Sequence, residues 1–175
     1  MQTNIVYLTG FMGSGKSTLG HILGRMLKYQ FIDLDRLIEE KERATIPELF
    51  ARFGEERFRE LERLAVHETT KMAGTVIATG GGAPCFFDNM EVMNKNGTTV
   101  YLQLSPETLV RRLLPGQESR PLIAGKSEDE LQAFIRDRLK ERAPYYQKAH
   151  IIADTDKLSP EETARTIVQA MKWSQ

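Results

Sequence analysis

The sequence predicts an α/β fold with three layers, α/β/α, around a central parallel sheet of five strands. Five short β-rich runs alternate with segments whose apolar residues recur at helical spacing. Parallel strands need helical crossovers, and these crossovers cover both faces of the sheet. A glycine-rich stretch at residues 9–18, TGFMGSGKST, joins the first β-rich run to the first helical segment. At 175 residues the chain has the length of one domain, so we expect a single unit over residues 1–175.

The first half of the chain alternates strand and helix and then gives way to a mainly helical stretch. Apolar residues from Leu19 to Leu27 follow the period of a helix, and the third strand, TVIAT, runs into three consecutive glycines. The elements expected in this half are strands at 4–9, 31–33 and 75–79 and helices at 16–27, 36–43, 46–53 and 55–72.

The second half predicts two more strands and four helices. Ser105 suits a helix cap and Pro106 suits a first helical turn, so a helix begins there. The expected elements are strands at 98–104 and 150–153, a short helix ending at 91–96, the helix opened by Ser105-Pro106, and helices at 128–146 and 159–173. Residues 115–127 are polar, carry glycine and proline, and are too long for a routine connection. We expect a mobile lid there, within about 112–127.

Composition excludes several classes of protein. Lysine plus arginine equal aspartate plus glutamate at 24 each, which leaves no electrostatic footprint for nucleic acid or an anionic membrane. No run approaches the roughly 18 apolar residues of a membrane span. The N-terminus lacks the pattern of a secretory signal. The single cysteine, Cys85, rules out an internal disulfide, and we expect an inert thiol in a cytoplasmic protein.

The glycine-rich stretch is a phosphate-binding motif. Gly10, Gly15, Lys16 and Ser17 fit the spacing G-x-x-x-x-G-K-[ST] between a strand and a helix. Backbone N–H groups from Gly13 to Ser17 can surround an anion at the helix N-terminus. Lys16 would neutralise the β- and γ-phosphates, and the Ser17 hydroxyl would bind Mg²⁺. These residues predict a P-loop NTPase fold with Mg²⁺ as cofactor and ATP held by Gly13, Ser14, Gly15, Lys16, Ser17 and Thr18.

Two aspartates follow the second strand. Residues i and i+2 of a strand point to the same side, so Asp33 and Asp35 could both face the phosphate site. One carboxylate could then hold the water shell of Mg²⁺ while the other accepts a hydroxyl proton. Aspartate also caps helices well, and a cap for a helix starting at Arg36 explains the pair equally well.

The glycines at 80–82 and a few arginines are further candidates for a binding site. The glycines allow a close approach to the backbone, although a flexible turn would also use them. Arg59 and Arg142 could clamp a carboxylate with their guanidinium forks, but taken singly each fits a surface ion pair better. Arg120, in the expected lid, could close onto a transferring phosphate. The neighbouring pair Arg111-Arg112 could stack on a base or simply be solvated.

Six motifs taken together point to a family. GFMGSGKST, DLD, FRELE, GGG, RPLI and ERAPYY occur in this order over nearly the whole chain. The set resembles shikimate kinase, within the nucleoside-monophosphate-kinase-like P-loop proteins. Many nucleotide-binding proteins share the first motif, and the other five are far more specific. RPLI stands where the family often has RPLL, which is a conservative apolar replacement.

The resemblance implies a reaction and a set of residue roles. The reaction is ATP-dependent phosphorylation of the 3-hydroxyl of shikimate, giving shikimate 3-phosphate and ADP, on the pathway to chorismate and the aromatic amino acids. The implied partners are ATP and shikimate, bound by a monomer whose substrate-binding helical segment covers about 34–62. The implied roles are catalytic for Lys16, Asp35 and Arg120, substrate-binding for Asp35, Arg59, Gly81 and Arg142, metal-binding for Ser17 and Asp33, and nucleotide-binding for Arg111, Arg120 and the loop 154–160.

Two alternatives to this function remain at the level of sequence. One is a P-loop kinase for another small polyol acid such as gluconate, or for a nucleotide. The other is a nucleotide-binding regulator without catalysis. Asp35, Arg59 and Arg142 are all present, which favours a catalyst.

Overall fold

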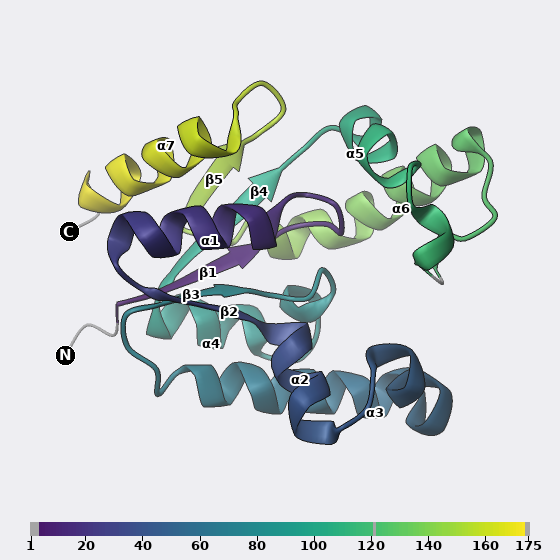
Figure 1. The fold of residues 1–175 in the computed structure, drawn as a ribbon, viewed down its shortest axis with the longest axis horizontal. Helices are drawn as coiled ribbons and strands as arrows, with labels where there is room; N and C mark the ends of the chain where they lie inside the picture. The colour runs from purple at the N-terminus through teal and green to yellow at the C-terminus, as the bar shows by residue number, and fades with distance from the viewer. Residues whose placement is uncertain (1–3, 121, 174–175) are drawn as a thin grey trace.

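Five parallel strands form one sheet in the order β2-β3-β1-β4-β5 in the computed structural model, which describes residues 4–120 and 122–173 (Figure 1). The strands are β1 (Ile5–Thr9), β2 (Gln30–Asp33), β3 (Thr75–Ala78), β4 (Thr98–Gln103) and β5 (Ile151–Asp154). β1 is central and pairs in parallel with β3 on one side and β4 on the other. The predicted five-stranded parallel sheet is therefore confirmed.

Helices cover both faces of this sheet, as Figure 1 shows. They are α1 (Lys16–Leu27), α2 (Leu34–Glu42), α3 (Ile46–Thr69), α4 (Asn89–Asn96), α5 (Pro106–Leu113), α6 (Glu128–Tyr146) and α7 (Pro160–Trp173). Val6 and Leu8 of β1 pack in one core cluster with α1 and α7. Ile5 and Tyr7 alternate to the opposite face and pack with α2, α3 and α4. Successive side chains of β1 thus enter the cores on opposite faces of the sheet, and the sheet with its two helical layers makes three layers.

A third core lies beyond the carboxyl ends of the strands. Phe11, from the glycine-rich loop, packs there against Leu109 and Leu113 of α5 and Leu131 and Ile135 of α6. This cluster attaches the segment between α5 and α6 to the phosphate-binding end of the sheet.

The start of α2 differs from the sequence expectation. The helix begins at Leu34 rather than Arg36, because the Asp33 carboxylate caps it by accepting from the N–H groups of Asp35 and Arg36. Asp35 therefore lies in the first turn of a helix. The premise that Asp33 and Asp35 both belong to a strand and point to the same side of it was therefore wrong.

Two further breaks in the chain lie where the sequence places them. Gly54 has φ 76° and ψ 177°, so α3 is two helices joined at the predicted boundary between residues 53 and 55. Residues 114–127 separate α5 from α6 and contain only one short helical turn among their described residues, Gln117–Ser119. Pro121 of the RPLI motif lies outside the described residues. None of the described helices is long and apolar enough to cross a membrane.

Candidate active site

The glycine-rich loop follows β1 and wraps around the ammonium group of its own lysine. Lys16 Nζ donates to the carbonyl oxygens of Gly10 at 2.8 Å and Phe11 at 2.9 Å. Gly13 and Gly15 have φ angles of 77° and 90°, which an L side chain adopts only with strain. Gly15 also caps α1 without any side-chain hydrogen bond, so the N–H groups of the first turn stay available to an anion.

Two carboxylates compensate in part for the burial of Lys16. Burial lowers the pKa of Lys16 to about 8, and the charges of Asp35 and Asp33 act in the opposite direction. The ammonium group therefore lies within the field of both aspartates, at the end of the sheet where the sequence predicts them.

Asp33 combines the two roles that the sequence leaves open. Its Oδ1 caps α2, and its Oδ2 accepts a hydrogen bond of 3.0 Å from Ser17 Oγ. Two oxygen ligands from different elements, one of them a carboxylate, suit Mg²⁺, which takes few protein ligands and completes its shell with phosphate and water. No cluster of three or more His, Cys, Asp or Glu side chains among the described residues could hold a metal by itself.

Asp35 lies against the triple-glycine loop. A methyl group at Gly80 would stand 2.7 Å from both Asp35 Oδ1 and Glu62 Oε1, so only glycine fits between the two carboxylates. Burial, with a contribution from the charge of Asp33, raises the pKa of Asp35 to about 6, and Lys16 opposes the rise. A half-buried carboxylate with this pKa is ionised at neutral pH and is more basic than an exposed one.

Arg59 is held in place by acidic partners on its own helix. Its guanidinium contacts Glu62 at 2.9 Å and Glu55 at 3.0 Å, and it stands 4.2 Å from the centroid of the Phe86 ring. Only 11% of its side chain is exposed, against 1% for Glu62, so the pair is not a solvated surface contact. Burial raises the pKa of Glu62 to about 7, and Arg59 acts against that rise. The sequence reasoning missed Glu62, although it lies three residues after Arg59 in FRELE and so shares its helix face.

Arg142 approaches the same region from α6. Its guanidinium lies 5.4 Å from the centroid of the Phe11 ring, and a methyl group at Gly81 would be 3.4 Å from its Nη1. Arg59 and Arg142 both line a cavity of about 320 Å³ whose other walls include Met12, Phe50 and Phe86. Arg138, Glu55 and Glu141 line it too, and Glu55 is already paired with Arg59. Three arginines beside an apolar wall suit a small organic anion.

A smaller cavity of about 140 Å³ lies on the other side of the glycine-rich loop. Ser14, Gly15, Thr18, Arg112, Thr155, Leu158 and Pro160 are among the residues that line it. Arg112 Nη1 lies 3.4 Å from the Ser14 carbonyl oxygen. Arg111, which the sequence resemblance favours, instead donates to Thr108 Oγ1 of its own helix at 3.0 Å and is not among the lining residues. The structure brings Arg112, not Arg111, to this cavity.

Arg120 lies apart from both cavities. Its Nη1 donates to the carbonyl oxygen of Gly116, at 2.9 Å, within the same connecting segment. Most of the predicted site residues converge on the carboxyl ends of β1, β2 and β3. Arg111 and Arg120 do not join them in this conformation.

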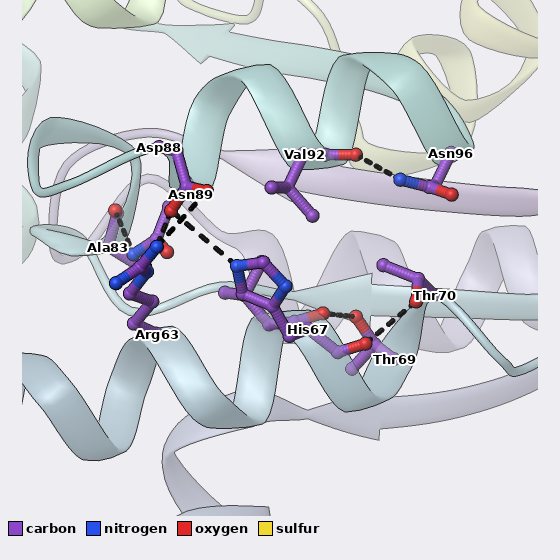
Figure 2. Close-up of polar contacts among 10 residues, drawn as sticks. Arg63, His67, Thr69, Thr70, Ala83, Asp88, Asn89, Val92 and Asn96 are labelled. Atoms are coloured by element: carbon purple, nitrogen blue, oxygen red, sulfur yellow. Dashed lines mark hydrogen bonds and ion pairs between the residues drawn. The ribbon is translucent and has the colours of Figure 1, made fainter.

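Side chains of α3 and of the start of α4 hold the segment after the triple glycine in place (Figure 2). Arg63 of α3 contacts Asp88 at 2.8 Å, and His67 reaches the same carboxylate at 3.5 Å. Asn89 is fully buried and donates from Nδ2 to the carbonyl oxygen of Ala83 at 2.9 Å. These contacts fix the segment that follows Gly82.

Known proteins match this arrangement over nearly its full length. A family model described as shikimate kinase matches residues 12–172. A shikimate kinase from Bacteroides fragilis (strain YCH46) is 49% identical over 167 residues, covering 95% of this chain and 93% of the relative. One from Moorella thermoacetica is 42% identical over 172 residues, covering 98% and 96%.

Solved structures give the same result. The crystal structure of shikimate kinase from Bacteroides thetaiotaomicron has a TM-score of 0.91 at 44% identity and covers 97% of this chain and 98% of that one. Shikimate kinase from Acinetobacter baumannii, solved in complex with shikimate, has a TM-score of 0.89 at 35% identity and covers 99% and 96%. A gluconokinase from Sinorhizobium meliloti, at 14% identity and a TM-score of 0.62, covers 99% and 94% and shares the fold.

Proposed function

The chain belongs to the shikimate kinase family, and we propose that it transfers the γ-phosphoryl group of ATP to the 3-hydroxyl of shikimate. The products are shikimate 3-phosphate and ADP, on the pathway to chorismate and the aromatic amino acids. One observation carries the proposal: two arginines face one cavity beside Asp35, next to a phosphate-binding loop. Shikimate is a small polyhydroxylated carboxylate, so it requires a cationic clamp and one proton acceptor. The cavity supplies the arginines, and Asp35, against Gly80 and within the field of Arg59, supplies the acceptor.

At the donor end, Gly13, Ser14, Gly15, Lys16, Ser17 and Thr18 hold the phosphates of ATP. The N–H groups of the first turn of α1 donate to phosphate oxygens. Lys16 donates to the carbonyl oxygens of Gly10 and Phe11 in this conformation and turns to the β- and γ-phosphates when ATP binds. The adenine fills the smaller cavity between Arg112 and the loop 154–160, and we assign Arg112 the place that the sequence gives to Arg111.

Ser17 Oγ and Asp33 Oδ2, which are 3.0 Å apart, would hold Mg²⁺. The ion supplies neutralising charge to the β- and γ-phosphate oxygens when it is bound. Capping by Oδ1 leaves Oδ2 of Asp33 directed at Ser17, so the start of α2 orients the metal site.

At the acceptor end, Arg59 and Arg142 bind the carboxylate of shikimate, and the loop around Gly81 contributes backbone N–H groups. Asp35 accepts the proton of the 3-hydroxyl or orients that hydroxyl toward the γ-phosphate. Phosphoryl transfer depends mainly on positioning and charge stabilisation, so one carboxylate of moderately raised pKa is sufficient.

Two segments move relative to the phosphate-binding loop and the triple-glycine loop. We assign residues 34–62 to shikimate binding and residues 112–127 to the lid. The contact of Arg120 with Gly116 belongs to an open lid, and closure carries its guanidinium to the phosphates. Closure also excludes water, which would otherwise take the phosphoryl group.

The test is a substrate panel. Release of ADP is measured with shikimate, gluconate, AMP or CMP as acceptor at fixed Mg²⁺ and ATP, and phosphorus NMR of the product locates the new ester. Of the four acceptors, we expect only shikimate to be phosphorylated. A rate with shikimate no higher than the background ATPase rate rejects the proposal. Faster turnover of gluconate selects the other kinase, and nucleotide binding without any turnover selects a regulator.

We also propose a cytoplasmic monomer. All the site residues come from one chain, ATP is the donor, and the only cysteine has its pKa raised by burial to about 11, as expected of an inert thiol. Sedimentation at the enzyme's working concentration tests the oligomeric state.

A further inference from the structure

Tyr146, in the last turn of α6, is buried against the triple-glycine loop. No part of the residue is exposed, and its hydroxyl donates to the carbonyl oxygen of Gly81 at 2.5 Å. Its ring stacks on Tyr101 with centroids 4.9 Å apart. Tyr146 lies four residues after Arg142, so both side chains leave α6 on the same side. The sequence reasoning gave Tyr146 no role.

The hydrogen bond from Tyr146 fixes the orientation of one peptide group. No cis peptide bond occurs among the described residues, so the Gly82 N–H points opposite to the Gly81 carbonyl and away from Tyr146. On the other side of Gly82, the buried Asn89 holds the carbonyl oxygen of Ala83 (Figure 2). The backbone is thus anchored on both sides of Gly82.

The N–H groups of Gly81 and Gly82 lack an acceptor among the described residues. Gly82 is buried, and a buried N–H without a partner is rare in proteins. A methyl group at Gly82 would stand 2.7 Å from Nη1 of Arg59, and the Arg142 guanidinium is next to Gly81. Free backbone donors between two cations form a site for an anion.

We propose that Tyr146 is a positioning residue, whose hydroxyl turns the Gly81–Gly82 peptide so that the Gly82 N–H donates to the substrate carboxylate between Arg59 and Arg142. The inference rests on the proposed function, because it takes the carboxylate of shikimate as the anion. Without the hydroxyl, the Gly81 carbonyl loses its buried partner and the peptide can rotate. The carboxylate then loses a fixed third donor while Arg59 keeps its partners. Arg142 also interacts with the Tyr146 hydroxyl, so the resonance of the Gly82 amide, and not KM alone, reports the turn of the peptide.

The variant that tests this is Tyr146→Phe, with Tyr101→Phe as the matched control. Both replacements remove one hydroxyl from the same stacked pair, and no hydrogen bond joins the Tyr101 hydroxyl to a described residue. We expect KM for shikimate to rise about tenfold in Tyr146→Phe, because a lost buried hydrogen bond changes binding by about that factor. KM for ATP and kcat should stay within about twofold, as expected when an interaction is equally strong in the ground and transition states.

The methyl ester of shikimate separates positioning from a general structural defect. The ester lacks the charged carboxylate, so its dissociation constant, measured by calorimetry, should be equal in wild type and Tyr146→Phe. In wild type, the amide proton resonance of Gly82 should shift downfield with shikimate and not with the ester, and the shift should be smaller in Tyr146→Phe.

Each outcome decides a separate point. An unchanged KM for shikimate in Tyr146→Phe, an equal loss in Tyr101→Phe, or the same loss with the ester overturns the role of Tyr146. If Tyr146→Phe does not fold, the wild type still tests the proposal. An amide proton resonance of Gly82 that does not shift when shikimate binds overturns the role of Tyr146. A wild-type enzyme that neither binds nor phosphorylates shikimate rejects the proposed function instead.

Discussion

Replacing Asp35 by asparagine should make the protein more stable and nearly inactive. Asp35 is held where burial and the charge of Asp33 both disfavour its ionised form. An asparagine of similar shape removes the charge and keeps the size of the side chain. The stability of the wild type is therefore limited by a group that we assign to catalysis.

The size of the effect follows from the pKa of Asp35. Its value rises from 3.8 to about 6 in the folded protein. At about 1.4 kcal/mol per pKa unit, ionising this group in the fold costs at most about 3 kcal/mol at neutral pH. Coupling to Asp33 and partial access to water reduce this figure, so we expect a gain of about 1–3 kcal/mol for Asp35→Asn. For a chain of this length that gain raises Tm by roughly 2–12 °C.

The dependence on pH has a definite sign. The folded pKa of Asp35 lies above the unfolded value, so its contribution to stability is present below pH 3.8 and is lost as pH rises to about 6. The free energies of unfolding of Asp35→Asn and wild type should therefore agree near pH 4 and diverge up to about pH 6. Above that pH their difference should be constant.

Urea unfolding at pH 4, 5, 6 and 7.5 measures this difference, with Asp137→Asn on the exposed face of α6 as control. The control should stay within about 0.5 kcal/mol of wild type at every pH. In the same samples, Asp35→Asn should bind ATP normally and lose about 100-fold or more in kcat. A variant less stable than wild type at pH 7.5, or a difference that does not vary with pH, would refute the electrostatic reasoning.

Three further predictions rest on the same geometry. The ratio kcat/KM for shikimate should fall as pH drops below about 6, because Asp35 must be ionised to accept a proton; a rate profile flat down to pH 5 would remove its role as base. Arg112→Ala should raise KM for ATP about tenfold and Arg111→Ala less than twofold, since only Arg112 lines the smaller cavity; initial rates at varied ATP decide, and the reverse order would restore Arg111. Gly82→Ala should raise KM for shikimate at least tenfold by displacing the Arg59 guanidinium 2.7 Å away; an alanine at position 82 that binds shikimate normally would show that Arg59 can move freely.

The sequence predicts best what depends on neighbouring residues. The phosphate-binding loop, the cap at Ser105 and the break at Gly54 are each encoded within a few positions, and the structure has all three. The contact between Ser17 and Asp33 is also accessible, since their elements follow one another along the chain.

Contacts between distant segments were not accessible in the same way. Tyr146 and Gly81 are 65 residues apart, and they meet only because the fold packs α6 against the short helical turn Ala83–Cys85 that follows the triple glycine. Arg111 and Arg112 are adjacent, and the rotation of α5 decides which of them faces the loop. Leu113 fixes that rotation because it packs directly against Gly13. A methyl group at position 13 would lie only 2.8 Å from the Leu113 side chain. Local sequence does not contain this information.

The order of the strands has a consequence for how the reacting groups keep their distance. β1 and β3 are hydrogen-bonded neighbours, and the loops that follow them touch: a methyl group at Gly81 would lie 3.3 Å from the backbone nitrogen of Met12. The loop assigned to the donor and the loop assigned to the acceptor are therefore separated by about one strand spacing, roughly 4.8 Å. The hydrogen bonds between β1 and β3 keep this distance fixed. Motions of α2, α3 and the segment 112–127 can change which ligands are enclosed. The distance between the donor loop after β1 and the acceptor loop after β3 stays the same.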